Sequence, residues 1–328
     1  MITNMMDISI PYYEDKSRIN NTAIGWFLYG GPSYFHKKMS GEIPDEESRA
    51  MSKGTMIHMY LLQPDEFEKH YRVSGMQKPK SQQQEKFCQE LVNTTEIEPD
   101  LVLLSAYKKV YSIVGKSEAK MLSEAKEIAS TLNSYIESLK DTEHTYITQY
   151  DMKLLWSIRQ NIDKHIAAKP LLNDPSAQHE FHINWEFPTY EGVARCKSLL
   201  DSVKFDTENK VCTIMDLKTT VHIHNFEKSV EQYDYFRQFM FYKLSAEWYI
   251  RNELHQDSEG WIFRVYIIAI DTVSDNEVRV FEFVDEQLKS RLDDIESVIT
   301  NIMWCNKTGN WSHTRDYYEN NGIEYLNL

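Results

Sequence analysis

The stretch IMDLKTT, residues 214–220, places an acid and a lysine two residues apart in a run whose residue types favour an extended strand. Alternate residues of a strand project from the same face, so Asp216 and Lys218 are expected to lie side by side. Upstream, Asp201 stands within the apolar run SLLDSV, where a carboxylate needs a partner that compensates its charge. Residues of these types at this spacing suit chemistry on a phosphate ester.

The polar run between the two acids predicts how they meet. If residues 207–210 form the loop of a hairpin, Asp206 faces Val211, and counting outward puts Asp201 opposite Asp216. The Cβ atoms of such cross-strand neighbours lie about 4.5–5.5 Å apart. Two carboxylates at that distance repel each other unless a cation lies between them, and a divalent metal is the usual cation for oxygen ligands.

A carboxylate pair with an adjacent lysine can support metal-assisted attack on a phosphodiester. A metal there polarises the phosphoryl oxygen and lowers the pKa of its water, while Lys218 stabilises the added negative charge or orients the nucleophile. The alternative is a solvated surface hairpin in which Asp216 and Lys218 form an ordinary ion pair. The D-x-K triplet is common in proteins, so it is the opposed Asp201 that favours the metal site.

The elements that must position these residues change character along the chain. The first half has the apolar periodicity of helices, and the second half mixes strands with helices. Helices are predicted from Asn20 or Asn21 to residue 35, and over about 45–63, 81–95, 99–115, 117–140, 147–168, 226–254 and 285–304. Strands are predicted over about 178–187, 192–205, 211–221, 261–271 and 277–284. A helical part followed by the order βββαββα indicates an α/β (α+β) fold.

Composition narrows the class of protein. The 328 residues are 41% hydrophobic, which is typical of a globular chain with a sizeable core. The net charge of −14 disfavours a protein that coats nucleic acid, although it is compatible with a local basic channel. No stretch is apolar and long enough to span a membrane, the first residues do not resemble a signal peptide, and the four cysteines lack CxxC spacing. We therefore expect a cytoplasmic protein without a membrane partner.

Four blocks of the sequence together resemble a known family. The run GVARCKSLLDSVKFDTENKVCTIMDLKTT is similar to the strand–turn–strand core of PD-(D/E)XK nucleases, and in particular of RecE-like (exonuclease VIII-type) phage exonucleases. KGTMIHMYLLQPDEFEKHY resembles the G-x-x-x-H helix and the L-x-P-x-x-F element of that family, and YDYFRQFMFYKL resembles its Y-x-x-Q-x-x-x-Y helix. Each block is weak alone, whereas their order and spacing are specific together.

The resemblance implies a fold and a division of the chain. The fold would be a restriction-endonuclease-like core, in which a mixed central sheet is flanked by helices, with a large helical N-terminal part. Residues 1–328 would form a single nuclease domain. Within it, residues 1–175 would be the mainly helical part that carries His58, and residues 176–328 the sheet-centred catalytic core.

The resemblance also assigns roles to residues. The metal ligands would be His58, Asp201, Asp216 and the backbone carbonyl of Leu217. The catalytic residues would be Lys218, Asp216, Asp201, Gln238 and Tyr242. For His58 the plainer alternative is a core histidine on an amphipathic helix. For Gln238 and Tyr242, which share a helix face, it is a surface stripe.

Two further assignments rest on weaker signals. The family has an additional acid ahead of the hairpin, and Glu180, Glu186 and Glu191 are its candidates here. A row of basic residues would hold the phosphate backbone of DNA without reading bases. Arg195 and Lys197 have the parity of Asp201 and would share its face, and Arg237 lies next to Gln238.

The implied activity is that of a deoxyribonuclease dependent on Mg²⁺ or Mn²⁺, most simply an exonuclease that degrades linear double-stranded DNA from its ends in phage-type recombination. The implied partners are DNA ends, a single-strand annealing protein and further copies of the chain. One alternative is an endonuclease or strand-specific nuclease on the same core. The other is a non-catalytic DNA-binding or assembly protein, which the intact Asp201, Asp216 and Lys218 set disfavours. The polarity of digestion and the role of residues 305–328 are left open by the sequence.

Overall fold

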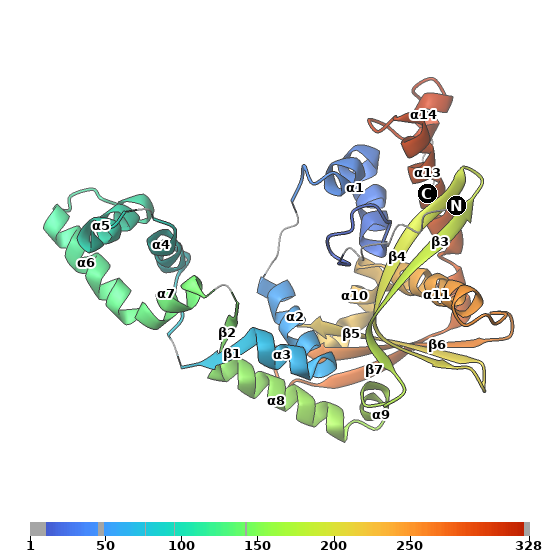
Figure 1. Ribbon diagram of the computed structural model, residues 1–328, viewed down its shortest axis with the longest axis horizontal. Coiled ribbons are helices and arrows are strands. Elements are labelled where there is room, and N and C mark those ends of the chain that lie inside the picture. Colours follow the sequence, from blue (N-terminus) through green and yellow to red (C-terminus); the bar gives the residue numbers. More distant parts are fainter. Residues whose placement is uncertain (1–10, 45–48, 76, 95, 142, 325–328) are drawn as a thin grey trace, which may run out of the picture. The chain divides into compact units, whose positions relative to one another are not determined.

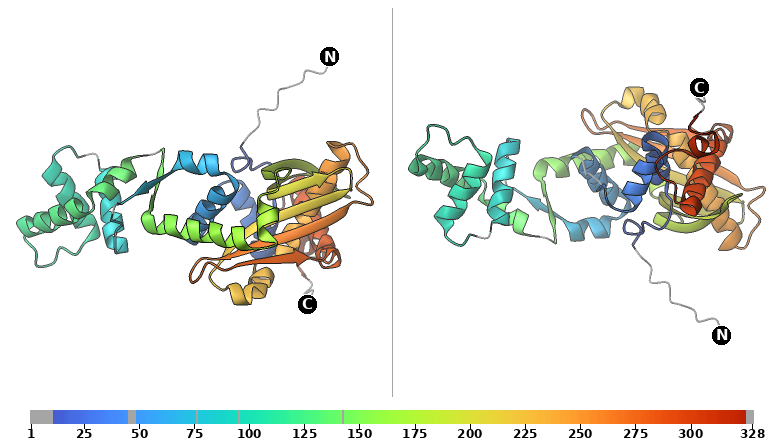
Figure 2. Two further views of the ribbon diagram at one scale, coloured as in Figure 1. Left: turned by 90° about the horizontal axis from the view of Figure 1, so that it is seen from below. Right: turned by 90° about the horizontal axis from the view of Figure 1, so that it is seen from above.

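A computed structural model describes residues 11–44, 49–75, 77–94, 96–141 and 143–324 of the chain. The chain divides into two compact units, which are described one at a time (Figures 1 and 2). Unit 1 comprises Met1–Leu62 and Ile158–Leu328, and unit 2 comprises Gln63–Ser157. Unit 2 is therefore inserted into the sequence of unit 1. That the whole chain works as a single nuclease domain stays a prediction.

Unit 1 is built on a five-stranded mixed sheet in the order β3-β4-β5-β6-β7 (Figure 1). Neighbouring strands are antiparallel except β5 and β6, which are parallel. The strands are β3 (Gln178–Thr189), β4 (Gly192–Asp206), β5 (Val211–Thr220), β6 (Ile262–Asp271) and β7 (Val278–Phe283). A mixed sheet flanked by helices confirms the predicted fold class.

The hairpin that motivated the metal site is present. β4 ends at Asp206, β5 begins at Val211, and these two residues are paired, as the polar run predicted. The side chain of Asp206 accepts a hydrogen bond from the backbone N–H of Asn209 at 3.0 Å, which closes the turn. The pairing continues to Ser202 and Met215, one step before Asp201 and Asp216.

Helices pack against this sheet and complete its core. Helices α11 and α13 contact β3 and β4, α1 contacts both of those helices, and α2 contacts β5. Trp185, Phe239 and Phe241 are fully buried between them, and burial of each such ring contributes roughly 2–3 kcal/mol. The helices of unit 1 are α1 (Asn21–Met39), α2 (Arg49–Leu62), α9 (Ala168–Leu172), η1 (Ile223–Asn225), α10 (Phe226–Gln232), α11 (Tyr235–Asn252), α12 (Asp285–Lys289), α13 (Leu292–Thr308) and α14 (Arg315–Glu319).

The long helix predicted over residues 226–254 is in fact two helices, α10 and α11. Between them Asp234 has a φ of 48°, in the left-handed region, so the helix cannot run through it. Its carboxylate accepts hydrogen bonds from Arg237 Nε at 3.1 Å and from Arg291 Nε at 3.0 Å. These two ion pairs stabilise the backbone conformation that separates α10 from α11. They join α11 to the residue that precedes α13, and periodicity alone does not predict such a contact.

Unit 2 is mainly helical, as the first half of the sequence predicted. Phe87, Cys88, Tyr107 and Ala125 are buried in its own core. A two-stranded parallel sheet of β1 (Tyr71–Ser74) and β2 (Thr145–Thr148) was not predicted, because each strand is only four residues long. The helices are α3 (Pro64–His70), α4 (Gln82–Asn93), α5 (Pro99–Val110), α6 (Glu118–Thr131), α7 (Asn133–Lys140) and α8 (Gln149–Lys164), whose last turns belong to unit 1.

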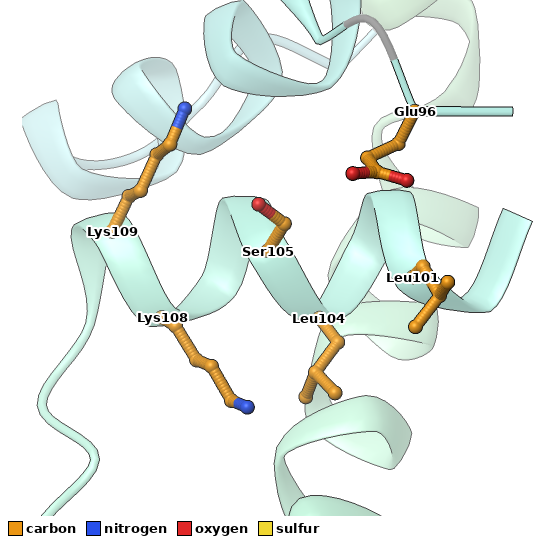
Figure 3. Close-up of a pocket in the computed structure, with 6 residues that line it drawn as sticks. All are labelled: Glu96, Leu101, Leu104, Ser105, Lys108 and Lys109. Atoms are coloured by element: carbon orange, nitrogen blue, oxygen red, sulfur yellow. The ribbon is translucent and has the colours of Figure 1, made fainter. Parts of the chain in front are cut away.

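A pocket of about 400 Å³ lies on unit 2, and Figure 3 shows its lining. The residues that line it are Glu96, Leu101, Leu104, Ser105, Lys108 and Lys109. Both lysines are already paired, Lys108 with Glu118 and Lys109 with Glu90. None of the predicted site residues belongs to this pocket. Among the described residues, no helix has the length and apolar character needed to cross a membrane.

We predict that Asp234→Asn lowers the free energy of unfolding by about 1–3 kcal/mol, because Arg237 is buried and would lose the charge that compensates its own. Asparagine tolerates the left-handed backbone, so the substitution tests the charge rather than the turn. Unfolding in urea measures the change. Asp293→Asn, at an exposed acid of the first turn of α13, is the matched control and should change stability little. Equal effects of the two substitutions would contradict the assignment.

Candidate metal and catalytic site

Three side chains from three elements of unit 1 meet at one place. They are His58 of α2, Glu180 of β3 and Asp201 of β4, and one potential ligand atom of each lies within 4.8 Å of the others. Ligand atoms of a single divalent cation are at most about 4–5 Å apart, since each lies roughly 2.0–2.6 Å from the ion. The group therefore has the dimensions of a cation site. His58 reaches it from a separate helix, as the sequence predicted.

A distortion of the sheet brings the two carboxylates of this group together. β3 and β4 pair at His179 with Ser202 and at Phe181 with Leu200, but not at Glu180 and Asp201 between them. Glu180 has a φ of 48°, which is uncommon for a residue other than glycine and costs roughly 1–3 kcal/mol. Strain of this kind is found where the surrounding structure holds a side chain for a function.

The contacts of His58 favour a cation beside it. Its Nε2 lies 2.8 Å from the Leu217 carbonyl oxygen, so this nitrogen donates a hydrogen bond. In a neutral ring the other nitrogen, Nδ1, then offers a lone pair, and it lies 3.4 Å from Asp201 Oδ2. A lone pair and a carboxylate face each other only with a proton or a cation between them. The donor set of one imidazole and two carboxylates fits a divalent metal.

Two backbone features place α2 and β5 for these contacts. Asp201 Oδ2 accepts a hydrogen bond from the backbone N–H of Leu217 at 2.7 Å, so the carboxylate replaces the next bond of the hairpin. Gly54 lies on α2 opposite Thr219, where an added Cβ would be 3.4 Å from the Thr219 hydroxyl oxygen. At this position α2 is therefore in van der Waals contact with the strand that carries the D-x-K triplet.

The predicted catalytic lysine and the polar pair of α11 form a second group around Asp216. Lys218 Nζ lies 2.6 Å from Asp216 Oδ2, and the Asp216 side chain is only 1% exposed. Gln238 Nε2 donates to Asp216 Oδ1 at 3.3 Å and to the Tyr242 hydroxyl at 2.9 Å. The ring of Tyr235 lies 5.2 Å below the Lys218 ammonium. The sequence analysis did not single out Tyr235, although it belongs to the YDYF block.

The charges of the site shift the pKa values of its members. Burial, followed by the negative charge of Asp201, raises the pKa of Glu180 to about 7. The same two causes raise the pKa of Asp216 to about 6, although Lys218 opposes the shift. Burial alone would lower the pKa of Lys218, but the charges of Asp216 and Asp201 raise it above its ordinary value. The lysine is thus held as a cation, while the acids compete for protons.

The structure distinguishes among the three candidates for the additional acid. Glu180 is the one that joins His58 and Asp201. Glu186 is exposed further along β3, and Glu191 is bound by Lys307 at 3.0 Å and by Arg315 at 3.1 Å. Asp216, a predicted ligand, lies outside the group of three and contacts Lys218 instead.

The predicted basic row needs correction at two of its three positions. Lys197 is 4% exposed, and its ammonium donates to the backbone carbonyl oxygens of Tyr12 and Asp15. Arg237 is also 4% exposed and is paired with Asp234. Neither side chain is free to contact DNA in this structure, because other parts of the chain cover both. Only Arg195 is exposed.

The sequence matches the family described as "PDDEXK-like domain of unknown function (DUF3799)" over residues 27–319. The chain belongs to this PDDEXK-like family. The matched segment contains every residue of the two groups described above. This membership confirms the PD-(D/E)XK resemblance, and the nucleases of that superfamily use divalent metals.

Comparison of the PDDEXK-like chain with curated proteins found no match. Among solved structures, the chain is similar to a protein from Eubacterium rectale named "Putative exonuclease", with 14% identity and a TM-score of 0.47, over 100% of this chain and 96% of that one. It is also similar to SSO0001, with 11% identity and a TM-score of 0.26, over 69% of this chain and 85% of that one. Neither likeness is close enough to assign an activity.

We predict that Glu180→Gln stabilises the protein in the presence of a metal chelator at about pH 8 but not at about pH 5. The pKa of Glu180 is raised from 4.5 to about 7. The folded chain therefore binds this proton more tightly than the unfolded chain, and the carboxylate reduces stability as pH rises through that interval. Glutamine has no such charge. Thermal unfolding at the two pH values measures the difference.

With Mn²⁺ present the order should reverse, because Glu180→Gln removes a ligand while the wild-type protein gains stability from the bound ion. Glu186→Gln, on the exposed part of the same strand, is the matched control and should alter neither result. A variant that is less stable than the wild type at about pH 8 without metal would contradict the charge repulsion inferred for Glu180.

Proposed function

We propose that this protein is a metal-dependent deoxyribonuclease that degrades linear double-stranded DNA from its ends. The observation that carries the nuclease proposal is the arrangement of His58, Glu180 and Asp201 around one position, together with the Asp216–Lys218 contact. This arrangement provides cation ligands, and it provides a fixed ammonium group on the same hairpin. Both contribute to hydrolysis of a phosphodiester by stabilising the negative charge of the transition state.

The roles of the residues follow from their contacts. His58, Glu180 and Asp201 would hold a Mg²⁺ or Mn²⁺ ion, and the family resemblance would add Asp216 as a further ligand. The resemblance would also add the Leu217 carbonyl, whose oxygen accepts the hydrogen bond of His58 Nε2 in this structure and would have to exchange that bond for the ion. The ion, when bound, would supply Lewis-acid polarisation of the phosphoryl group and a more acidic water. Lys218 would stabilise the negative charge that develops on the phosphate, since its pKa keeps it cationic.

Gln238 and Tyr242 act through Asp216 in this proposal. The amide of Gln238 donates to both the carboxylate and the Tyr242 hydroxyl, so it fixes the direction in which Asp216 points. Burial raises the pKa of Tyr242 well above its usual value, and the hydroxyl therefore stays neutral. A neutral amide and hydroxyl orient the carboxylate without adding another negative charge to the site.

The exonuclease part of the proposal is supported by the four sequence blocks that resemble RecE-like phage exonucleases. The same resemblance suggests a role in phage-type recombination in the cytoplasm of a bacterial host. It also suggests a single-strand annealing protein as a partner, and assembly of several copies of the chain around DNA. Arg195, exposed on β4, would contact the phosphate backbone.

Substitution of Asp216 and substitution of Lys218 should each impair cleavage, but for different reasons. Asp216→Asn removes a charge that attracts the metal, and we expect it to weaken Mn²⁺ binding by about 10–100-fold. Lys218→Ala should leave metal affinity nearly unchanged and should lower the cleavage rate by about 10²–10³-fold, because it removes stabilisation of the transition state. Calorimetry with Mn²⁺ and cleavage of end-labelled duplex measure the two effects. Equal losses of metal affinity would contradict the division of roles.

The choice between exonuclease and endonuclease is tested with two forms of the same plasmid. In Mg²⁺ or Mn²⁺ the protein should shorten the linear form progressively and leave the covalently closed circle intact. The Lys218→Ala variant and a reaction with chelator serve as controls for contaminating nucleases. Rapid linearisation of the circle by the wild-type protein, absent from the Lys218→Ala reaction, would overturn the exonuclease proposal and leave the nuclease proposal standing.

A further inference from the structure

The segment before α1 forms a tight turn, which we call the N-terminal turn (residues 11–15). Its backbone is closed by hydrogen bonds from the N–H groups of Glu14 and Asp15 to the Pro11 carbonyl oxygen, at 2.9 and 3.1 Å. Two tyrosines, Tyr12 and Tyr13, occupy the corner of this turn. The family resemblance assigned no role to either residue.

The N-terminal turn and the residues that connect it to α1 are held against β4 at two points. Ile19 forms a parallel bridge with Cys196, through backbone hydrogen bonds to Arg195 and from Lys197 of 2.9 Å each. The Lys197 ammonium donates to the Asp15 carbonyl oxygen at 2.6 Å and also to that of Tyr12. A buried ammonium is costly unless its hydrogen bonds are made, so these contacts hold the turn in place.

The two tyrosine rings belong to one series of aromatic contacts that begins at His182 on β3. The Tyr12 ring lies under the Lys197 ammonium at 4.3 Å. It also packs edge-on against His182, with ring centroids 5.1 Å apart. His182 lies two residues after Glu180 on β3. Tyr13 contacts Tyr12 in turn, with centroids 5.2 Å apart and an angle of 89° between the rings.

The position of Tyr13 is therefore fixed by its neighbours, while its ring is exposed to solvent. It is 76% exposed, although its neighbour Tyr12 is held by Lys197 and His182. Through Tyr12 and His182 it is joined to β3, the strand that carries Glu180. An exposed aromatic ring on a fixed turn, packed through these contacts against a strand of the cation site, is arranged to receive a flat apolar group.

We propose that Tyr13 stacks on the base of the nucleotide next to the scissile phosphate and so positions the DNA end at the metal group. This inference rests on the proposed nuclease function and goes beyond it, because it names a substrate-contacting residue outside the nuclease core. Stacking on an aromatic ring tolerates any base, as a nuclease without sequence preference requires. A tyrosine fixed by its neighbours also loses little conformational entropy when the base binds.

The test measures affinity for DNA without cleavage, in the Lys218→Ala background with Mn²⁺ present. Adding Tyr13→Ala should weaken binding of a duplex with an unpaired terminal nucleotide by about 5–150-fold, the range measured for loss of one stacked base. Adding Tyr13→Phe should restore the affinity, because the ring is kept. Tyr190→Ala is the matched control, since Tyr190 is equally exposed on unit 1 but lies at the β3–β4 turn.

An abasic terminal nucleotide makes the test specific for stacking. It should weaken binding to the parent protein as much as Tyr13→Ala does, and it should cause no further loss in the Tyr13→Ala protein. Additive losses, or a Tyr13→Ala protein that binds like the parent, would overturn the stacking proposal while the parent still binds DNA. A parent protein that binds no DNA would overturn the proposed function and this inference together.

Discussion

The repulsion among three carboxylates at one end of a sheet is the constraint on which the site depends. The negative charge of Asp201 raises the pKa of both Glu180 and Asp216, and Asp216 has almost no contact with water. Each is compensated differently. Asp216 contacts the Lys218 ammonium and the Gln238 amide, and Asp201 accepts a hydrogen bond from the Leu217 backbone N–H. Glu180 contacts none of these three groups. The remaining negative potential is what a divalent cation would neutralise.

The same constraint shapes the backbone around the site. Beyond Ser202 the hairpin is no longer joined by backbone pairs, and the Asp201 side chain occupies the place of the next bond. On the other side of β4, the pairing with β3 is interrupted at Glu180. Asp201 thus sits where β4 has lost its regular backbone partners on both sides. A carboxylate can point into a shared site only where the sheet leaves room for it.

The sequence predicts those parts of the site that depend on local geometry. The hairpin register followed from a polar run and a period of two, and counting residues was therefore enough to relate Asp201 to Asp216. Glu180 could not be chosen over Glu186 and Glu191, because its selection depends on a left-handed residue inside a strand. No pattern of residue types predicts that backbone conformation within a strand.

The predictions that were wrong concern residues whose contacts come from segments distant in the sequence. The alternation of side chains along β4 predicted that Lys197 lies on an open basic face. In the structure the chain before α1 covers this lysine, and its backbone carbonyl oxygens accept the hydrogen bonds of the ammonium. Asp234, which pairs with Arg237, likewise depends on a contact with Arg291, the residue that precedes α13. The helix break at Asp234 is set by these tertiary ion pairs, which outweigh a helical propensity that continues through the segment.

The insertion of unit 2 between α2 and β3 has a consequence for how the site is assembled. His58 is synthesised long before Glu180 and Asp201, and the whole of unit 2 separates them along the chain. An ion held by all three residues would act as a reversible crosslink that closes the long loop of chain between them. The stabilisation that a crosslink gives to the folded state increases with the entropy of the loop that it closes. Because unit 2 has its own buried core, it shortens the effective loop before the ends meet. The nascent chain consequently has no complete cation site until β4, which carries Asp201, has been synthesised and has folded with α2 and β3. Under the proposed function, metal-dependent cleavage could not precede that stage.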